Sequence, residues 1–310
     1  MRQASGLLAS VPLRIATFNV LFGAWDSWAE RRPLVARAIE RTRADVLGLQ
    51  EVFPSQLANL ADVLGDLAYV PGPSGGAARG FDRSPALEVL KRAARLRLPR
   101  LFEMARALSE RAAHGEHQPI AYRGDRLRPL ASGAFWISST PTHPGSKLPL
   151  ALAAFLVHWV EFERLDGTEA LLVFNAHFGH APWHYTATQR TVTSQLQAVV
   201  DARAAAAGAA SGQRRRSVFL IGDFNCLPSS PLVRGLLSPS GAGFTDAVRS
   251  ARARVGPPVT FHWGRGATRL GLALDYVLAR HAPGAQRAEV VDAHEGRRYP
   301  SDHHPLVVEF

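Results

Sequence analysis

The chain has 310 residues, of which 46% are apolar and 20% are charged, so it is long enough for one large or two ordinary domains and is not expected to be disordered. Its formal net charge of +10 predicts attraction to polyanions, although an arginine-rich composition throughout the chain explains the charge equally well. The single cysteine, Cys226, excludes an internal disulfide framework, and we expect it to be packed in the interior.

The N-terminus shows no targeting segment. Residues 1–10 are expected to be a tail, too short for a secretory signal, and no apolar run of about 18 residues occurs in the chain. We therefore expect a soluble, cytoplasmic protein, unless an export signal has been removed from it. Because neither an internal repeat nor a long linker is present, residues 11–310 are predicted to form one domain.

A strand, a helix and a second strand begin this domain. Residues 13–20 are β-branched and aromatic, residues 29–43 carry apolar side chains at helical spacing, and residues 44–49 form another apolar run. Such a unit brings the ends of its two strands to the same edge of a sheet. We therefore expect Asn19 and Glu51 to lie close together.

A helical insertion is predicted at residues 77–116. Its central part, residues 85–113, is rich in leucine and arginine and is interrupted at Pro99, which indicates two helices. One interpretation is a basic amphipathic element that touches a membrane or a polyanion. An ordinary surface helix pair with a solvated charged face is favoured, because apolar stripes usually pack on the core.

The second half of the chain is predicted to consist mostly of strands, separated by turn signals. The expected strands are residues 120–123, 127–138, 151–163, 169–176, 218–221, 259–262, 272–278, 287–291 and 305–310. The expected helices are residues 183–207 and 231–237. Helices and strands thus alternate throughout, which is typical of an α/β or α+β domain.

The stretch SVFLIGDFNCLP, residues 217–228, carries the most informative pair of polar residues. Asp223 and Asn225 follow an apolar run that is short enough for a buried strand. In extended geometry they project to the same side, at the strand end where ligands meet sheets. An Asx turn is the alternative explanation for this pair, since both residue types are common in turns.

Polar residues of the same kinds begin or end six predicted segments. They are Asn19, Glu51, His177, Asp223 with Asn225, Asp275, and Asp302 with His303. Asp275 lies within an apolar strand, where a carboxylate is costly to bury unless it is paired, and the SDHH segment supplies a histidine partner. Carboxylates and amides form a hard oxygen site that suits Mg²⁺ or Mn²⁺. With two histidines to bind phosphate or move protons, this set fits metal-assisted hydrolysis of a phosphate ester.

Six short sequence motifs resemble those of a known protein family. They are TFNV (17–20), LQEV (49–52), NAHFGH (175–180), IGDFN (221–225), LDYVL (274–278) and SDHHPL (301–306). In this order they resemble the endonuclease/exonuclease/phosphatase family, the DNase-I-like superfamily, over the whole chain. The resemblance implies a four-layer sandwich of two packed mixed β-sheets flanked by helices.

The resemblance also implies a role for each polar residue. Glu51 is implied as the principal ligand of Mg²⁺ or Mn²⁺, with Asn19 beside it and Asp302 in or near the metal shell. The implied catalytic residues are His177, Asp223, Asn225, Asp275 and His303. Among these, Asp223 is expected to orient or deprotonate the attacking water, Asn225 to hold the phosphate, and Asp275 to hold the ring of His303 against the scissile phosphate.

Two positions depart from the family pattern and leave the substrate open. Gly179 stands where the family often has an aspartate, and Leu274 stands where a basic or polar residue is usual. We expect a metal-dependent phosphoesterase that acts most readily on phosphodiesters of a nucleic-acid or phospholipid type. The alternatives are a phosphomonoesterase or inositide phosphatase, and an inactive phosphate-binding module. The expected partners are an anionic phosphate ester, nucleic acid through its backbone, and a membrane surface through residues 85–113, with the protein a monomer.

Overall fold

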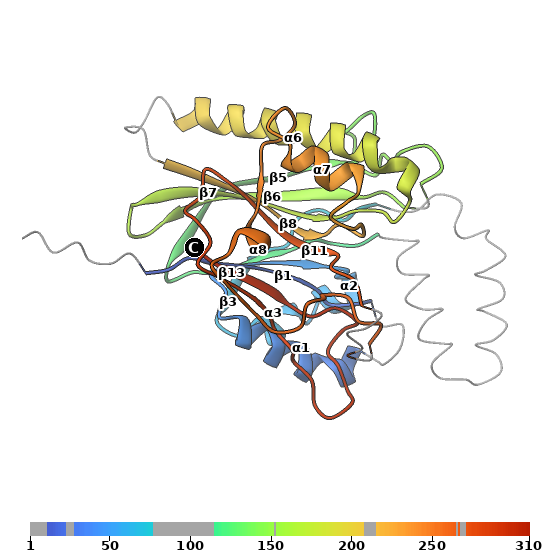
Figure 1. Cartoon of the computed structure of the whole chain (residues 1–310), viewed down its shortest axis with the longest axis vertical. Coiled ribbons are helices and arrows are strands. Elements are labelled where there is room, and N and C mark those ends of the chain that lie inside the picture. Colours follow the sequence, from blue (N-terminus) through green and yellow to red (C-terminus); the bar gives the residue numbers. More distant parts are fainter. Residues whose placement is uncertain are drawn as a thin grey trace, which may run out of the picture.

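The computed structural model describes residues 11–22, 28–76, 115–151, 153–207, 215–264, 266 and 271–310. Two mixed β-sheets pack face to face, and helices cover the outer face of each, so the chain forms the predicted four-layer sandwich (Figure 1). The predicted insertion at residues 77–116 lies outside the described residues, apart from its last two.

The first sheet has seven strands within the described residues. Their order is β10-β12-β13-β1-β2-β4-β3. The strands are β1 (Arg14–Asn19), β2 (Val46–Gln50), β3 (Leu67–Val70), β4 (Ile120–Arg123), β10 (Ala253–Val255), β12 (Arg287–Val290) and β13 (Leu306–Glu309). The central strand β1 runs parallel to β2 and antiparallel to β13, which joins the first and last strands of the chain.

The second sheet has six strands in the described part of the chain, in the order β5-β6-β7-β8-β11-β9. The strands are β5 (Leu127–Trp136), β6 (Leu156–Arg164), β7 (Glu169–His177), β8 (Arg215–Asp223), β9 (Thr245–Asp246) and β11 (Asp275–Arg280). Strands β7 and β8 are parallel, and β11 runs antiparallel to β8. The end of β7, the end of β8 and the start of β11 therefore meet at one edge.

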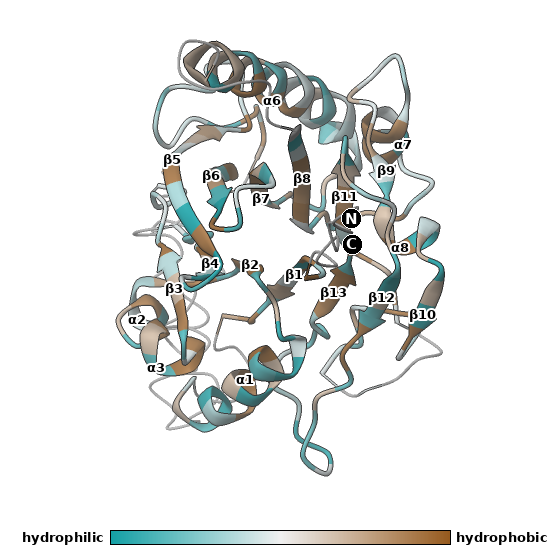
Figure 2. Cartoon of the chain, turned by 90° about the vertical axis from the view of Figure 1, so that its left-hand side faces the viewer, coloured by the Kyte–Doolittle hydropathy of each residue, from teal (hydrophilic) through white to brown (hydrophobic). Residues whose placement is uncertain are grey.

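Helices close the sandwich on both sides (Figure 2). They are α1 (Trp28–Thr42), α2 (Pro54–Leu57), α3 (Leu60–Leu64), a 3₁₀ turn η2 (Pro182–His184), α6 (Tyr185–Ala207), α7 (Pro231–Leu237) and α8 (Ala247–Ser250). The apolar faces of α6 and α7 pack on the six-stranded sheet, and those of α1 and α3 pack on the seven-stranded sheet. None of the helices in the described ranges is long and apolar enough to cross a membrane.

Strand β8 shows why an almost wholly apolar strand belongs at the centre of such a fold. Val218 and Leu220 face the helical layer, whereas Phe219 and Ile221 face the opposite sheet. Because successive side chains point to opposite faces, a strand buried on both sides must be apolar at every position. The sequence run 218–221 is therefore the pattern of a central strand.

A buried polar bridge joins the two sheets within this apolar interior. Gln50 Nε2 on β2 donates to Asn175 Oδ1 on β7 at 2.6 Å, and it also donates to Thr17 Oγ1 on β1 at 3.0 Å. Asn175 Nδ2 in turn donates to the carbonyl of Leu49 at 2.9 Å. All three side chains are fully buried. Buried polar groups must find partners, so this bridge specifies how the sheets are aligned beneath the edge where the motifs converge.

The strand expected at residues 259–262 does not form. Phe261 makes only isolated bridges, to Leu272 and to His303. Strand β11 starts at Asp275, three residues later than expected, so Asp275 begins the strand instead of lying inside it. The short elements β3, β9, α8 and β10 were not predicted, because segments of two to four residues carry too little periodicity.

Candidate active site

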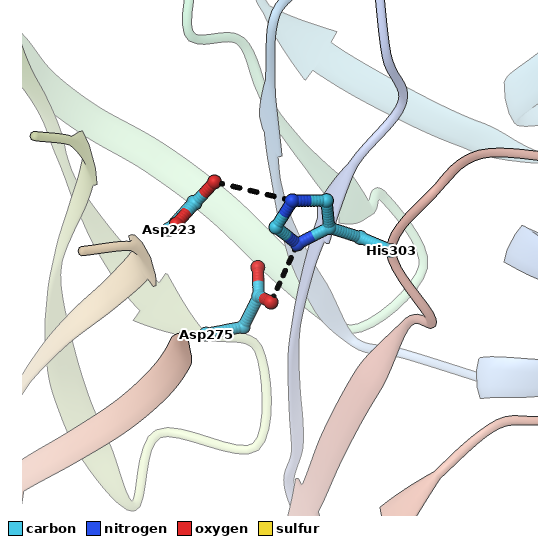
Figure 3. Close-up of side chains that lie close together, drawn as sticks. All are labelled: Asp223, Asp275 and His303. Carbon is cyan, nitrogen blue, oxygen red and sulfur yellow. Dashed lines mark hydrogen bonds and ion pairs between the residues drawn. The ribbon is translucent and has the colours of Figure 1, made fainter. Parts of the chain in front are cut away.

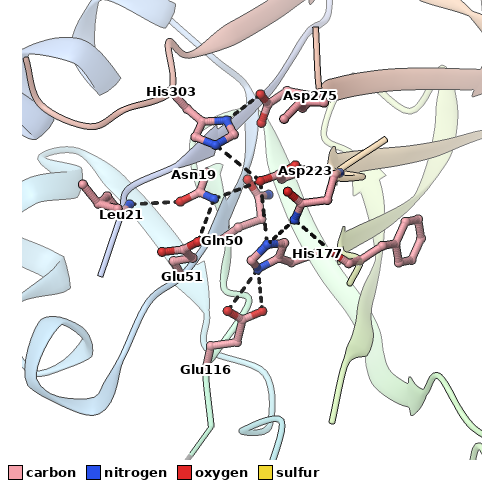
Figure 4. A network of polar contacts seen from close by, with 12 residues as sticks. Asn19, Leu21, Gln50, Glu51, Glu116, His177, Asp223, Asp275 and His303 are labelled. Atoms are coloured by element: carbon pink, nitrogen blue, oxygen red, sulfur yellow. Dashed lines mark hydrogen bonds and ion pairs between the residues drawn. The ribbon is translucent and has the colours of Figure 1, made fainter. Parts of the chain in front are cut away.

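The predicted polar residues gather at one edge of the sandwich (Figure 4). Asn19 ends β1, Glu51 follows β2, and Asp223 ends β8. Asn19 Nδ2 lies between the two carboxylates, donating to Glu51 Oε1 at 3.2 Å and to Asp223 Oδ2 at 3.0 Å. The edge therefore brings together one strand end from each of three strands, two in one sheet and one in the other.

The backbone at this edge adopts conformations that side chains usually avoid. Glu51 has φ +58° and Asn225 has φ +51°. Such left-handed residues cost on the order of 1 kcal/mol or more and occur where the surrounding structure requires them, often at functional sites. Gly222 has φ +139°, and a Cβ atom there would lie 1.8 Å from the carbonyl oxygen of Ala176. Only glycine allows β7 and β8 to approach so closely just before Asp223.

Asn19 is oriented as a donor in this structure. Its Oδ1 accepts from the amide of Leu21 at 3.0 Å, which leaves its Nδ2 facing the carboxylates. The amide of Phe22 donates to Glu51 Oε2 at 3.0 Å, so Glu51 is held from both sides. For Asn19 to act as a metal ligand, its side-chain amide must turn over, and this role stays a prediction.

Asp302 adds a third carboxylate near the first two. Burial raises the pKa of Asp302, the charge of His303 opposes this shift, and the charges of Glu51 and Asp223 add to it. Carboxylates that repel one another in a partly buried site are stabilised by a cation. The oxygen donors of Glu51, Asp223 and Asp302 therefore fit a hard divalent ion such as Mg²⁺ or Mn²⁺.

His303 stands between two aspartates (Figure 3). Its Nδ1 donates to Asp275 Oδ2 at 2.7 Å, and its Nε2 lies 3.5 Å from Asp223 Oδ2. Burial alone would lower the pKa of His303, but the charges of Asp275 and Asp223 outweigh it and raise the pKa to about 10. The ring of Phe261 packs against His303 with 4.9 Å between ring centroids.

Asp223, Asp275 and His303 also form a compact buried group, with one ligand atom from each within 4.8 Å of the others. Among the described residues it is the group that this spacing brings together as a candidate metal site. However, His303 Nδ1 and Asp275 Oδ2 bond each other, so these two atoms are not free to bind an ion. We therefore interpret Asp275 as the residue that orients the imidazole, and we assign the cation to the oxygens of Glu51, Asp302 and Asp223.

His177 also lies near the carboxylate of Asp223. Its Nε2 is 3.7 Å from Asp223 Oδ2, and its Nδ1 is 2.8 Å and 3.0 Å from the two oxygens of Glu116. Burial would lower the pKa of His177, but the charges of Glu116, Asp223 and Glu51 raise it to about 9. Each imidazole at this edge thus has a carboxylate partner behind it.

Asn225 favours the neutral form of that ring. Its Nδ2 lies 2.8 Å from His177 Nε2 and also donates to the carbonyl of Phe178 at 2.9 Å. An amide nitrogen can donate to Nε2 only when this nitrogen carries no proton. The Phe178 carbonyl fixes the orientation of this amide, so the Nε2 of His177 is unprotonated as long as the contact holds. Protonation of His177 then requires the amide of Asn225 to turn.

Glu116 is the site residue that sequence reasoning missed. It is 5% exposed and belongs to no strand, and it reaches His177 across 61 residues of sequence. Its local sequence, HGEHQPI, contains no strand end and no apolar run that would have marked it. A buried histidine that needs a carboxylate partner was the only available signal, and that signal names no particular glutamate.

Comparison with known proteins agrees with this architecture. The profile described as the Endonuclease/Exonuclease/phosphatase family matches residues 16–303. The chain therefore belongs to this family, and this membership suggests a phosphoester hydrolase. No curated protein sequence matches the chain.

Solved structures show the same fold at low sequence identity. An endonuclease/exonuclease/phosphatase from Bacteroides vulgatus is 18% identical with a TM-score of 0.73, covering 96% of this chain and 98% of its own. A mannosyl-6-phosphatase from Bacteroides thetaiotaomicron is 20% identical with a TM-score of 0.69, covering 96% and 98%. D. rerio TDP2 complexed with a single-strand DNA product is 15% identical with a TM-score of 0.60, covering 96% and 98%.

Proposed function

We propose that the chain is a metal-dependent phosphoesterase that hydrolyses phosphodiesters. The observation that carries this proposal is the gathering of Glu51, Asp223 and Asp302 near two imidazoles, each of which is backed by its own carboxylate. Clustered carboxylates hold a hard cation, and carboxylate-backed imidazoles bind or protonate phosphate oxygens.

Glu51 is the residue best placed to hold Mg²⁺ or Mn²⁺, with Asp302 and a turned Asn19 beside it. When bound, such an ion neutralises the charge that develops on the phosphoryl oxygens. The net charge of +10 would also favour the approach of an anionic ester to the protein.

The remaining residues act on water and phosphate. Asp223 orients the attacking water and takes up its proton as the new oxygen–phosphorus bond forms. His303 contacts a phosphoryl oxygen. Turning of the Asn225 amide frees its Nδ2 to donate to the same group and allows His177 to take a proton at Nε2 and to contact a second phosphoryl oxygen. The bond from phosphorus to the ester oxygen then breaks, and the departing alkoxide takes a proton from solvent water, while Asp223 returns its proton to solvent, so that a phosphomonoester and an alcohol leave the site.

A nucleic-acid backbone is the substrate class that the charge favours. No base-reading motif occurs in the sequence, so recognition through backbone phosphates is expected. A phospholipid head group, approached through the basic residues 85–113 outside the described ranges, is the other diester class. We expect the enzyme to act as a monomer, and this expectation is part of the proposal.

A phosphomonoester is the second candidate substrate. One structural neighbour, from Bacteroides thetaiotaomicron, is named a mannosyl-6-phosphatase and shares the fold over 96% of this chain. Monoester and diester hydrolysis differ in the groups that surround the phosphate, because the monoester carries an additional negative charge and lacks the second ester group.

Hydrolysis of bis(p-nitrophenyl) phosphate and of p-nitrophenyl phosphate separates these candidates. We expect Mg²⁺-stimulated turnover of the diester to fall ~100-fold or more in Glu51→Gln and His303→Ala, as when a transition-state contact is removed. Glu295→Gln is the matched control, because this glutamate is 62% exposed and pairs only with exposed Arg37. Wild-type turnover in both site variants, with intact thermal unfolding, would refute the proposal.

A substrate panel then identifies the class. Single-stranded and double-stranded DNA, RNA, sphingomyelin vesicles and phosphoinositides are compared at equal enzyme concentration. Deletion of residues 85–113 is expected to change substrate preference or lipid binding and to leave Mg²⁺ stimulation intact. A folded deletion variant with unchanged kinetics on every substrate would show that residues 85–113 have no role in substrate preference.

A further inference from the structure

Arg31 is a buried arginine on a helix whose other arginines are at least partly exposed. It lies in the first turn of α1 and is 2% exposed, whereas its neighbour Arg32 is 41% exposed at the side chain. A buried guanidinium is costly to desolvate, so a fold keeps it only where its donors are well satisfied.

Its guanidinium joins two loops that are far apart in the sequence. Nη2 donates to the carbonyl of Leu21 at 2.7 Å, and Nη1 donates to the carbonyls of Val20 at 2.8 Å and Pro300 at 2.6 Å. The ring of Trp28 lies 5.7 Å from the guanidinium carbon. The planar fork of arginine suits such a contact, because it presents several donors in fixed directions.

Both loops carry residues of the active site. Val20 and Leu21 directly follow Asn19, and the amide of Leu21 holds Asn19 Oδ1. Leu21 has φ +60°, a conformation that needs support from its surroundings. The carbonyl of Leu21 accepts from Arg31 Nη2 at 2.7 Å and from Gln56 Nε2 at 3.1 Å, so Arg31 is one of two side chains that support the backbone orienting Asn19.

On the other loop, Pro300 directly precedes Ser301. Ser301 Oγ donates to the carbonyl of Asn19 at 2.7 Å and accepts from the amide of His303 at 3.1 Å. Arg31 and Ser301 therefore tie the same two loops at successive positions. The tie through Ser301 is part of the site edge, whereas the tie through Arg31 lies outside the groups that contact phosphate.

We propose that Arg31 is a positioning residue that sets the distance between the Asn19 loop and the His303 loop. Its charge is not used on the substrate, and its three hydrogen bonds hold the two halves of the site in register. Displacements of about 1 Å at catalytic groups reduce turnover by up to about 100-fold. The inference rests on the proposed function for its kinetic consequence, while the tie between the loops stands independently of it.

The test compares Arg31→Lys and Arg31→Met with Arg32→Met. Arg32 is the matched control because it is adjacent on α1 and, in the part of the chain that the structure describes, its guanidinium bonds Asp62 and Asn59 at 3.5 Å, away from both loops. We expect kcat for bis(p-nitrophenyl) phosphate to fall at least ~10-fold in both Arg31 variants with a smaller change in KM, and to be unchanged in Arg32→Met. Lysine keeps the charge, so a loss in Arg31→Lys assigns the effect to the fork.

Two further measurements exclude a purely structural role. In metal-free protein, amide hydrogen exchange at Leu21 and His303 is expected to accelerate in Arg31→Lys more than exchange in strand β8. In Arg31→Ala, ethylguanidinium is expected to restore part of the lost kcat, whereas ethylammonium at equal ionic strength restores none. Wild-type kcat together with unchanged loop exchange in a folded Arg31→Lys protein would overturn the inference.

Failure of the proposed function is recognised separately. If the wild-type protein hydrolyses no phosphate ester, the function proposed above is wrong, and loop exchange in Arg31→Lys still decides whether the arginine ties the loops. Accelerated exchange at Leu21 and His303 supports the tie in that case, and unchanged exchange contradicts it.

Discussion

Replacing Asn175 with leucine tests whether the polar bridge aligns the two sheets. The substitution keeps the number and branching of the side-chain heavy atoms but removes one acceptor for Gln50 Nε2 and the donor to the carbonyl of Leu49. A buried group left without a partner costs about 1–3 kcal/mol. Because Gln50 Nε2 keeps its bond to Thr17, we expect a loss of about 1–3 kcal/mol in the free energy of unfolding, a substantial part of the roughly 5–15 kcal/mol that a domain has.

The double variant makes this prediction sharper. Replacing both Gln50 and Asn175 with leucine removes donor and acceptor together, so the double variant should be more stable than the two single losses imply. We expect a coupling free energy of about 1 kcal/mol or more, as for residues in direct contact. Gln286→Leu is the control, because the exposed side chain of this glutamine donates to the carbonyl of Gly284, two residues away, and its loss should be within about 0.5 kcal/mol of zero.

Urea unfolding followed by tryptophan fluorescence measures these free energies, provided that the slope with denaturant is the same in every variant. Glu51 directly follows Gln50, and His177 lies two residues after Asn175, so a shift between the sheets should also reduce turnover. If Asn175→Leu unfolds with the wild-type free energy, or if the two losses simply add, the bridge does not align the sheets and the reasoning is wrong.

Three further predictions follow from the same geometry. In metal-free protein, Asp275→Asn should lower the pKa of His303 from about 10, as read by NMR titration, and an unchanged pKa would contradict the pairing. The stability that charged His303 contributes is fully present below its unfolded pKa of about 6.5 and is lost as the pH rises toward about 10. The free energy of unfolding should therefore fall between these two pH values. The fall should be smaller in the His303→Gln variant. Gly222→Ala should lower the melting temperature strongly, because its Cβ would meet the backbone of Ala176. Gly167→Ala, with φ +73° and no atom within 4 Å of the added Cβ, should lose only about 1 kcal/mol of unfolding free energy. Equal losses in the two variants would contradict the argument.

The fold could be predicted largely from local patterns. The run 218–221 reads as a central strand because a strand buried on both faces is apolar throughout, and β8 is such a strand. The run at 259–262 looks similar but forms only bridges, at Phe261. Local composition does not distinguish these two cases, since strand pairing depends on partners elsewhere in the chain.

The site could be predicted where a residue ends a strand. Asn19, Glu51, Asp223 and His177 lie at strand ends, so the topology that brings those ends together also brings their side chains together. Asp275 was expected to need a histidine, and in the structure it bonds His303. The roles of these residues in catalysis and metal binding stay predictions.

The sequence alone predicted the main strands and helices and the edge at which the polar motifs meet, because periodicity and strand ends are recorded locally. The resemblance of its six motifs to a known family implied the family and the four layers. Only the tertiary structure decided that Glu116 backs His177, that the Asn19 amide faces the carboxylates with its nitrogen, and that Arg31 holds the two loops. Each of these depends on a contact between segments that are distant in sequence, and the residue types involved are equally common on exposed surfaces. Burial and partner geometry, which arise only when the sheets pack, distinguish them.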